Sequence, residues 1–258
     1  MSAVRWGLIG VTGVTLAMPL AAQDALARTV ERAGSTTVRL AFRARPGVCG
    51  NGAGNSWSWG RTEWRGKKGE WESECTAGPV RVDMDVSNGV PTSIRFYVGG
   101  RWGALGDATD AGTVGAADAA RYFGALAEKA TTRVAKEAIV VATLADSADI
   151  TPLLLRVAKD DTRDREVRKS AVFWLGQAVG DAVAPLDKLA NDNDEDIEVR
   201  KQAVFALSQR PKDEAVPALI RIARGKGDAR VRKQAIFWLG QSGDPRAVQY
   251  FEDVLSKH

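Results

Sequence analysis

Closely spaced carboxylates are the first candidates for chemistry in this sequence. Asp192, Asp194 and Asp196, in the segment NDNDED, have the spacing that begins a calcium-binding loop. Such a loop needs glycine at its sixth position and glutamate at its twelfth, where this chain has Ile197 and Ala203. We therefore expect no metal site here, and we expect Asp196 to begin a helix as its N-cap.

Other catalytic patterns are weaker still. Asp83 and Asp85 alternate with apolar residues, as expected on the solvated face of a strand. The glycine-rich segment GVCGNGAGN lacks the lysine and the spacing of a phosphate-binding loop. The single histidine, His258, argues against histidine triads and multi-histidine metal sites. We predict a protein that is not an enzyme, with no catalytic residue, metal or cofactor.

A tryptophan-rich segment, WSWGRTEWRGKKGEWE, is the remaining candidate outside the helical part. Its tryptophans are interleaved with arginine and lysine, a combination that can stack on sugars or hold anionic polymers. The competing interpretation is that the rings fill the thin core of a small sheet, and we favour it. The alternative glycan-binding residues are Trp57, Trp59 and Trp64.

The N-terminus has the layout of a secretory signal peptide. Arg5 precedes an uncharged, mostly apolar run from Trp6 to Gln23, and small residues follow. Cleavage is expected after Ala22 or after Ala27, so residues 1–27 are assigned to the signal segment. The predicted location is periplasmic or secreted, with a mature chain that is not embedded in a membrane. The alternative is an N-terminal membrane anchor, although the run is short and contains glycine and proline.

Two cysteines, Cys49 and Cys75, lie close together in the chain. In an exported protein such a pair indicates a disulfide, which would stabilise the fold by about 3 kcal/mol on the chain-entropy model. The net charge of +4 is small and spread along the chain. We therefore expect no nucleic-acid partner.

Residues 35–102 have the alternating pattern of β-strands. Val80 to Val86 and Ile94 to Val98 form the arms of a predicted hairpin, and Asn88-Gly89 supplies its tight turn. This predicts a small antiparallel β domain closed by the disulfide. The glycine- and aspartate-rich residues 103–115 are predicted to be a linker.

Residues 116–258 change to helical periodicity and contain an internal repeat. Val167, Val199 and Val231 lie 32 residues apart, each followed by Arg-Lys. One helix pair per repeat predicts an α-solenoid, because a single pair cannot bury its apolar faces alone. The predicted fold class is thus α+β. Asp164, Asp196 and Asp228 are expected to be N-caps, and Pro152, Pro185 and Pro217 are expected near helix starts.

The pattern D-x-x-V-R-x-x-A-x-x-x-L-G, followed by a short helix with P-x-L, resembles the short HEAT repeat, including the HEAT-like repeats of phycobilin lyase subunits. The resemblance covers about Thr131 to Leu255. It implies a scaffold that holds a protein partner. Lyase chemistry does not follow from it, because no lyase-specific residue can be matched. The N-terminal part resembles no family that we recognise.

The repeated stretches AVFWLGQ, AVFALSQ and AIFWLGQ divide into two faces. At about 100° per residue, Val167, Ala171 and Trp174 cluster on one side, which predicts Trp174 and Trp238 in the core and Ala206 as their smaller counterpart. The repeated phenylalanine lies about 120° away from that core centre. It either fills the seam between repeats, the interpretation we favour, or forms an exposed aromatic ladder on the inner face that binds a protein partner. The candidate binding residues are Phe173, Phe205, Phe237, Lys169, Lys201, Lys233, Gln177, Gln209 and Gln241.

A row of arginines also recurs with the repeat, at Arg168, Arg200 and Arg232. It either attracts an acidic partner or pairs with aspartates of neighbouring turns, as HEAT-type repeats commonly do. We favour the structural role, because aspartates recur in the adjoining loops. Together these observations predict an exported, non-catalytic scaffold that binds a protein partner along the solenoid.

Overall fold

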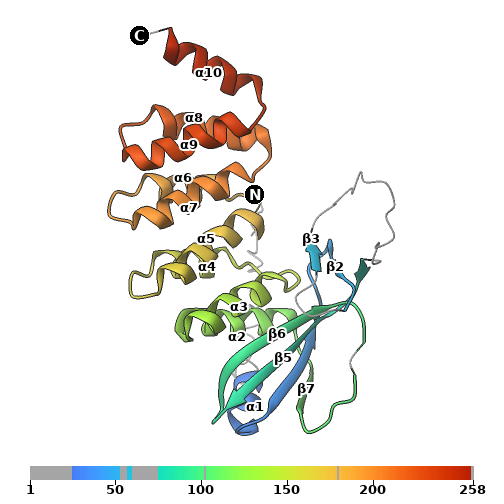
Figure 1. Cartoon of the computed structure of the whole chain (residues 1–258). Coiled ribbons are helices and arrows are strands. Elements are labelled where there is room, and N and C mark those ends of the chain that lie inside the picture. The colour runs from blue at the N-terminus through green and yellow to red at the C-terminus, as the bar shows by residue number, and fades with distance from the viewer. Residues whose placement is uncertain (1–24, 53–56, 60–74, 102, 179, 257–258) are drawn as a thin grey trace, which may run out of the picture.

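The structure is a computed structural model. It describes residues 25–52, 57–59, 75–101, 103–178 and 180–256, with the side chains of Ser58 and Trp59 excepted. Within these ranges a small β part is followed by a long series of helices, which confirms the predicted fold class. The helical series rises away from the sheets toward the C-terminus (Figure 1). In the described residues no helix has the length and apolar character needed to cross a membrane.

The main sheet has four strands in the order β6-β5-β1-β7. They are β1 (Thr37–Phe42), β5 (Val80–Ser87), β6 (Val90–Val98) and β7 (Thr109–Thr113). β5 and β6 form the predicted hairpin, whose turn places Asn88 and Gly89 at φ 51° and φ 76°. The apolar residues of β1 and β5 alternate into a core around Phe42 and Met84, both fully buried.

A second sheet carries the disulfide. Its strands are β2 (Val48–Gly50), β3 (Trp57–Trp59) and β4 (Thr76–Ala77), in the order β3-β2-β4. Cys49 on β2 is bonded to Cys75, the residue before β4, with the two Cα atoms 5.2 Å apart. The predicted disulfide is therefore present, and it closes this small sheet.

Two elements of the β part differ from the sequence-based expectation. Residues 103–115 are not only a linker, because β7 lies within them and pairs in parallel with β1, which makes the main sheet mixed rather than purely antiparallel. Helix α1 (Ala25–Ala33) contacts β1, β6 and β7 and buries Leu26 and Val30. Both elements have short or polar sequences whose structure depends on this tertiary pairing.

The helices form two layers (Figure 1). α3, α5, α7 and α9 pack on one another in sequence, and in the second layer α2 contacts α4, α6 contacts α8 and α8 contacts α10. Their bounds are α2 (Ala116–Lys129), α3 (Thr132–Thr143), α4 (Thr151–Lys159), α5 (Arg165–Ala178), α6 (Val183–Asn191), α7 (Ile197–Ser208), α8 (Lys212–Arg224), α9 (Ala229–Gln241) and α10 (Pro245–Leu255).

Aspartate caps begin the repeated helices, as predicted. The carboxylates of Asp164, Asp196 and Asp228 accept hydrogen bonds from backbone N–H groups two residues later, at 2.8 Å in each case. The expected proline position is wrong in one helix. Pro217 lies inside α8, which begins five residues earlier at Lys212.

Polar contacts join the β part to the solenoid. The Arg45 side chain donates to the carbonyl oxygens of Ala148 and Ala178, each at 3.0 Å, and so reaches the end of α5. The carboxylate of Glu137 on α3 accepts from the N–H of Ile94 at 2.9 Å, on the edge strand β6. An isolated β-bridge pairs Ala44 with a residue after α3. These contacts therefore hold the first helices of the solenoid against the β part.

Candidate functional site

A continuous chain of aromatic rings crosses from the β part onto the solenoid. We call it the aromatic row. Successive ring centroids are 5.0 to 6.4 Å apart, which is the range of favourable aromatic pairs. The rings, in spatial order, are Trp57, Trp174, Phe173, Phe205, Trp238 and Phe237.

The repeat explains how the row forms. A period of 32 residues puts one phenylalanine on each of α5, α7 and α9, and these helices pack side by side. Phe173 and Phe205 stack almost in parallel, with an interplanar angle of 13°. The next contact runs from Phe205 to Trp238 rather than to Phe237. The row therefore needs both members of the Phe-Trp pair.

The prediction that Trp174 and Trp238 are core residues is only partly correct, because both are half-buried. Ala206, their counterpart on α7, is fully buried. A Cβ atom on Gly176 would lie 2.8 Å from the Ala206 Cβ, so α5 and α7 approach closely there. The position of Ala206 on α7 therefore has no room for a tryptophan, and the two tryptophans lie on the flanking helices α5 and α9.

Exposure along the row increases toward the C-terminus. Phe173 and Phe205 are half-buried, whereas Phe237 is 54% exposed and its neighbour Ile236 is 38% exposed. α9 is the last member of its layer, and α10 packs against α8 and α9 without extending that layer. The first two phenylalanines thus fill seams between helices, and the third lies open, while the binding of a partner to these rings stays a prediction.

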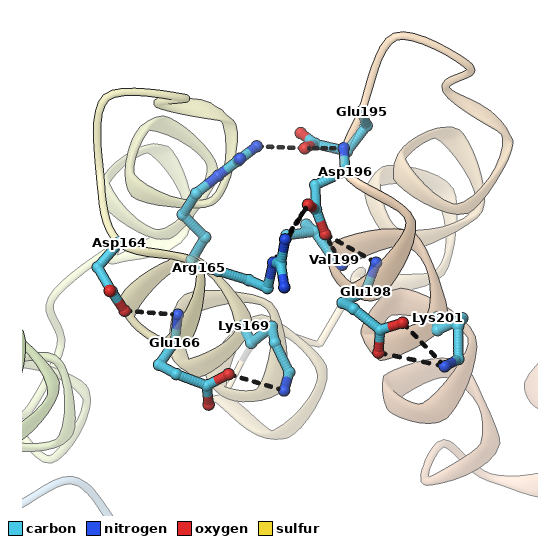
Figure 2. A network of polar contacts seen from close by, with 10 residues as sticks. Asp164, Arg165, Glu166, Lys169, Glu195, Asp196, Glu198, Val199 and Lys201 are labelled. Atoms are coloured by element: carbon cyan, nitrogen blue, oxygen red, sulfur yellow. Dashed lines mark hydrogen bonds and ion pairs between the residues drawn. The ribbon is translucent and has the colours of Figure 1, made fainter.

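The predicted lysines are not equivalent. Lys169 and Lys201 form ion pairs with Glu166 and Glu198, at 3.1 Å in each case, and Figure 2 shows the same arrangement in both repeats. Lys233 is exposed and makes no ion pair with any residue that the structure describes. In its repeat the glutamate is replaced by arginine.

That arginine, Arg230, binds the cap residue Asp228 at 2.9 Å. The open end of the row is therefore more positive than its beginning. The predicted glutamines Gln177, Gln209 and Gln241 are all exposed at the C-terminal ends of their helices.

The repeated arginines are structural, as favoured, but their partners differ from the expected aspartates. Arg168 and Arg200 are buried, at 6% and 4% exposure. Their Nε atoms donate to the carbonyl oxygens of Ala158 and Ala190 at 3.0 and 3.1 Å, near the end of the preceding helix. Arg232 is more exposed and makes one longer bond, of 3.4 Å.

The remaining guanidinium nitrogens of the two buried arginines have different partners. Arg168 forms a buried ion pair with Glu195, and Arg200 donates to the side-chain oxygen of Asn193 at 3.1 Å. The contact with a backbone carbonyl oxygen is thus the same in both repeats, whereas the side-chain partner differs. Since these guanidinium groups are occupied inside the solenoid, they do not form a surface for an acidic partner.

A polar bridge links consecutive repeats at the cap of α7. Arg165 pairs with Asp196 at 3.0 Å, and the same carboxylate accepts from the N–H groups of Glu198 and Val199 (Figure 2). Burial acts to raise the pKa of Asp196, but the two N–H groups and Arg165 outweigh it, so the pKa is lowered. These contacts therefore keep the Asp196 carboxylate ionised.

The carboxylates considered for chemistry have structural partners too. Asp192 accepts from the N–H of Asp194 at 3.2 Å, in a turn between α6 and α7. Asp83 is buried and pairs with Arg39 at 3.1 Å, so the expectation that it lies on a solvated face is wrong. Asp85 pairs with Arg95, which lowers its pKa. Among the described residues, no group of three or more His, Cys, Asp or Glu side chains is placed to hold a metal.

Of the three alternative glycan-binding residues, the structure describes the side chain of Trp57. Trp57 is half-buried, and its ring stacks on Trp174 with centroids 5.6 Å apart, which occupies one face of the indole. The Trp59 side chain and Trp64 lie outside the described residues. Trp57 therefore belongs to the aromatic row, a role that its position in the sequence did not indicate.

Comparison with known proteins agrees with the repeat. No curated protein matches the chain, and the N-terminal part matches no family. HEAT repeats generally act as non-catalytic scaffolds for protein–protein interaction. Residues 186–258, from within α6 to the C-terminus, match the family described as HEAT repeats, and the series of helices is consistent with a HEAT-like solenoid.

Proposed function

We propose that this protein is an exported, non-catalytic scaffold that binds a protein partner along the aromatic row. The observation that carries the proposal is the row itself, which runs without a break from Trp57 to Phe237 and becomes exposed at its end. Aromatic side chains are enriched in protein interfaces, and a few of them usually supply most of the binding energy.

The exposure of the row identifies its anchors. Phe237 offers most of a ring to a partner, and Ile236 adds a neighbouring apolar side chain. Phe173 and Phe205 each show part of a ring and are held in place by stacking. A side chain that is already ordered loses little entropy on binding, so these rings form a prepared surface.

Export is supported by the N-terminal sequence and by the disulfide. Residues 1–24 lie outside the described residues, so the signal segment stays a prediction. Leu26 and Val30 of α1 are buried in the core. Cleavage after Ala22 keeps α1 whole, whereas cleavage after Ala27 removes Leu26 from the core. We therefore propose the earlier position.

Partner capture tests the binding surface. The wild-type chain and a Phe173→Ser, Phe205→Ser, Phe237→Ser variant are used as baits on a periplasmic or secreted fraction, followed by mass spectrometry. We expect the variant to lose the captured partner. A matched control, Val90→Ser, Val248→Ser, Leu255→Ser, removes three exposed apolar side chains that are not members of the row. Equal capture by all three folded baits, as judged by circular dichroism, would remove the row from the proposal.

The N-terminus of the mature protein tests export. Mass spectrometry of protein purified from the producing cells is expected to show Gln23 as the first residue, with no free thiol. An N-terminus at Arg28 would contradict the proposed cleavage position. Intact Met1 in a cytoplasmic fraction would contradict export itself.

A further inference from the structure

A small pocket lies beside the open end of the aromatic row. Its volume is about 290 Å³, and it is bounded by the end of α7, the start of α8 and the end of α9. The Trp238 ring, which is part of the row, forms one wall, and two of the predicted binding glutamines, Gln209 and Gln241, form another. The pocket and the row therefore form one continuous surface.

One residue that lines the pocket carries a hydrogen-bond donor with no acceptor. The indole Nε1 of Trp238 is buried and makes no hydrogen bond to any residue that the structure describes. An indole N–H can only donate, so it needs a hydrogen-bond acceptor such as a carboxylate or carbonyl oxygen. Buried polar groups are normally paired, and an exception next to a cavity indicates a position for a ligand atom.

The charges of the pocket are positive. Arg210 and Lys212 line it, and none of the residues lining it is an aspartate or glutamate. Arg210 is held by Glu214 at 3.0 Å and by the Gly176 carbonyl oxygen, and so serves to shape the wall. Lys212 is exposed and forms no ion pair among the described residues, which leaves its ammonium group available to an anion.

Two further charged groups lie on α9 and at the start of α10. On α9, Lys233 lies one turn before Phe237 and also makes no ion pair within the described part of the chain. Asp244, the N-cap of α10, is bound by Arg246 at 2.8 Å, and Lys212 also contributes to lowering the pKa of its carboxyl group. An anion that enters the pocket thus meets Lys212, which forms no ion pair within the described residues.

We propose that this pocket receives the side-chain carboxylate of an aspartate or glutamate from the partner, while an adjacent apolar side chain of the partner packs on Phe237. The inference rests on the proposed function, because it gives the chemistry of the partner that the row binds. The carboxylate accepts from the Trp238 N–H as the exposed side chains of Gln209 and Gln241 move aside, and it pairs with Lys212.

Selection from a random peptide library tests this specificity. The purified full chain is panned against phage-displayed dodecapeptides, and enriched peptides are synthesised for affinity measurement. We expect an acidic residue next to Leu, Ile, Phe or Trp in the enriched sequences. Enrichment of neutral or basic peptides would overturn the inference but leave the proposed function standing. The absence of any enrichment dependent on Phe237 would overturn both.

Two substitutions then locate the carboxylate. Trp238→Phe keeps a ring and removes the N–H, so affinity for the acidic peptide is expected to fall about tenfold, as for a lost hydrogen bond to a charged group. Lys212→Ala is expected to weaken binding by up to about fivefold. The matched controls Tyr122→Phe and Lys188→Ala remove a ring donor on α2, outside the aromatic row, and an exposed lysine on α6, and are expected to bind within about twofold of wild type.

The acidic residue of the peptide provides the complementary test. Its replacement by glutamine or asparagine is expected to cause a similar loss with the wild-type protein and a much smaller one with Trp238→Phe, because the two changes remove the same interaction. Equal losses with both proteins would place the carboxylate elsewhere and overturn the assignment of the pocket.

Discussion

The three repeated arginines allow a graded test of what holds the solenoid together. Each is replaced by methionine, which keeps most of the side-chain volume and removes the charge. Arg168→Met leaves the buried carboxylate of Glu195 without its cation and the Ala158 carbonyl oxygen without its donor. Breaking a buried ion pair on one side costs about 3–5 kcal/mol, and we expect a loss of unfolding free energy in that range.

The other two positions are internal controls. Arg200→Met removes bonds to two neutral oxygens, from Ala190 and Asn193, and is expected to cost about 1–3 kcal/mol. Arg232→Met removes one bond of 3.4 Å at a more exposed position, and is expected to cost about 0.5 kcal/mol or less. The same substitution in three repeats should therefore cause three different losses of unfolding free energy. The loss should be larger where the partner atoms are more buried and carry a charge.

Urea unfolding followed by circular dichroism measures the three losses. The double variant Arg168→Met, Glu195→Gln removes the unpaired charge as well, so it should regain at least about 2 kcal/mol relative to Arg168→Met alone. Equal losses at all three arginines, or a loss below about 1 kcal/mol for Arg168→Met, would refute the conclusion that the buried contacts decide these energies.

Three further outcomes follow from single contacts. Gly176→Ala should cost about 1–3 kcal/mol in urea unfolding, because its Cβ meets that of Ala206, whereas Gly240→Ala, at the same repeat position with open space around it, should stabilise by up to about 1 kcal/mol. Under oxidising conditions Cys75→Ser should unfold with a free energy about 2–4 kcal/mol lower than that of the wild type. When both proteins are reduced, this difference should disappear. The Arg246 side chain and N–H lower the pKa of Asp244 to about 2, so its contribution should be present above about pH 4 and vanish toward pH 2. Asp244→Asn should flatten that part of a pH-dependent melting curve.

Local sequence patterns predicted the parts of the fold whose stability is local. The Asn88-Gly89 turn tolerates positive φ, and it forms the hairpin turn. Asp164, Asp196 and Asp228 precede helical repeats and cap them. The 32-residue period predicted helix pairs because stacking of equal units requires the same apolar positions in each.

The parts that were not predicted depend on contacts between distant segments. β7 has the polar sequence TDAGT, and it is a strand because its neighbour β1 offers an unpaired edge. Arg45 has no local pattern that would assign it to the end of α5, more than 130 residues away, where it bonds the Ala178 carbonyl oxygen. Such roles appear only when the chain is folded.

The tryptophans show why helical periodicity alone misplaced part of the candidate site. A helical projection assigns each residue to one direction, whereas a solenoid helix has neighbours at its base and on both sides. The projection assigns Trp174 to the core, but its ring is half-buried and stacks on Trp57 of the β part. The repeated Phe-Trp pair was the available signal, since two adjacent rings cannot both face one core.

The contact between Trp57 and Trp174 also bears on how the two parts of the chain act. β3 carries Trp57 and pairs with β2, and β2 is bonded through Cys49 to the segment that begins β4. The Trp57 ring also packs on Phe96 of the main sheet, with centroids 6.4 Å apart. The beginning of the aromatic row is therefore fixed by the β part, while its open end is fixed by the last helices. A solenoid separated from the β part would therefore lose the ring that covers Trp174 and would expose apolar surface at both ends of the row.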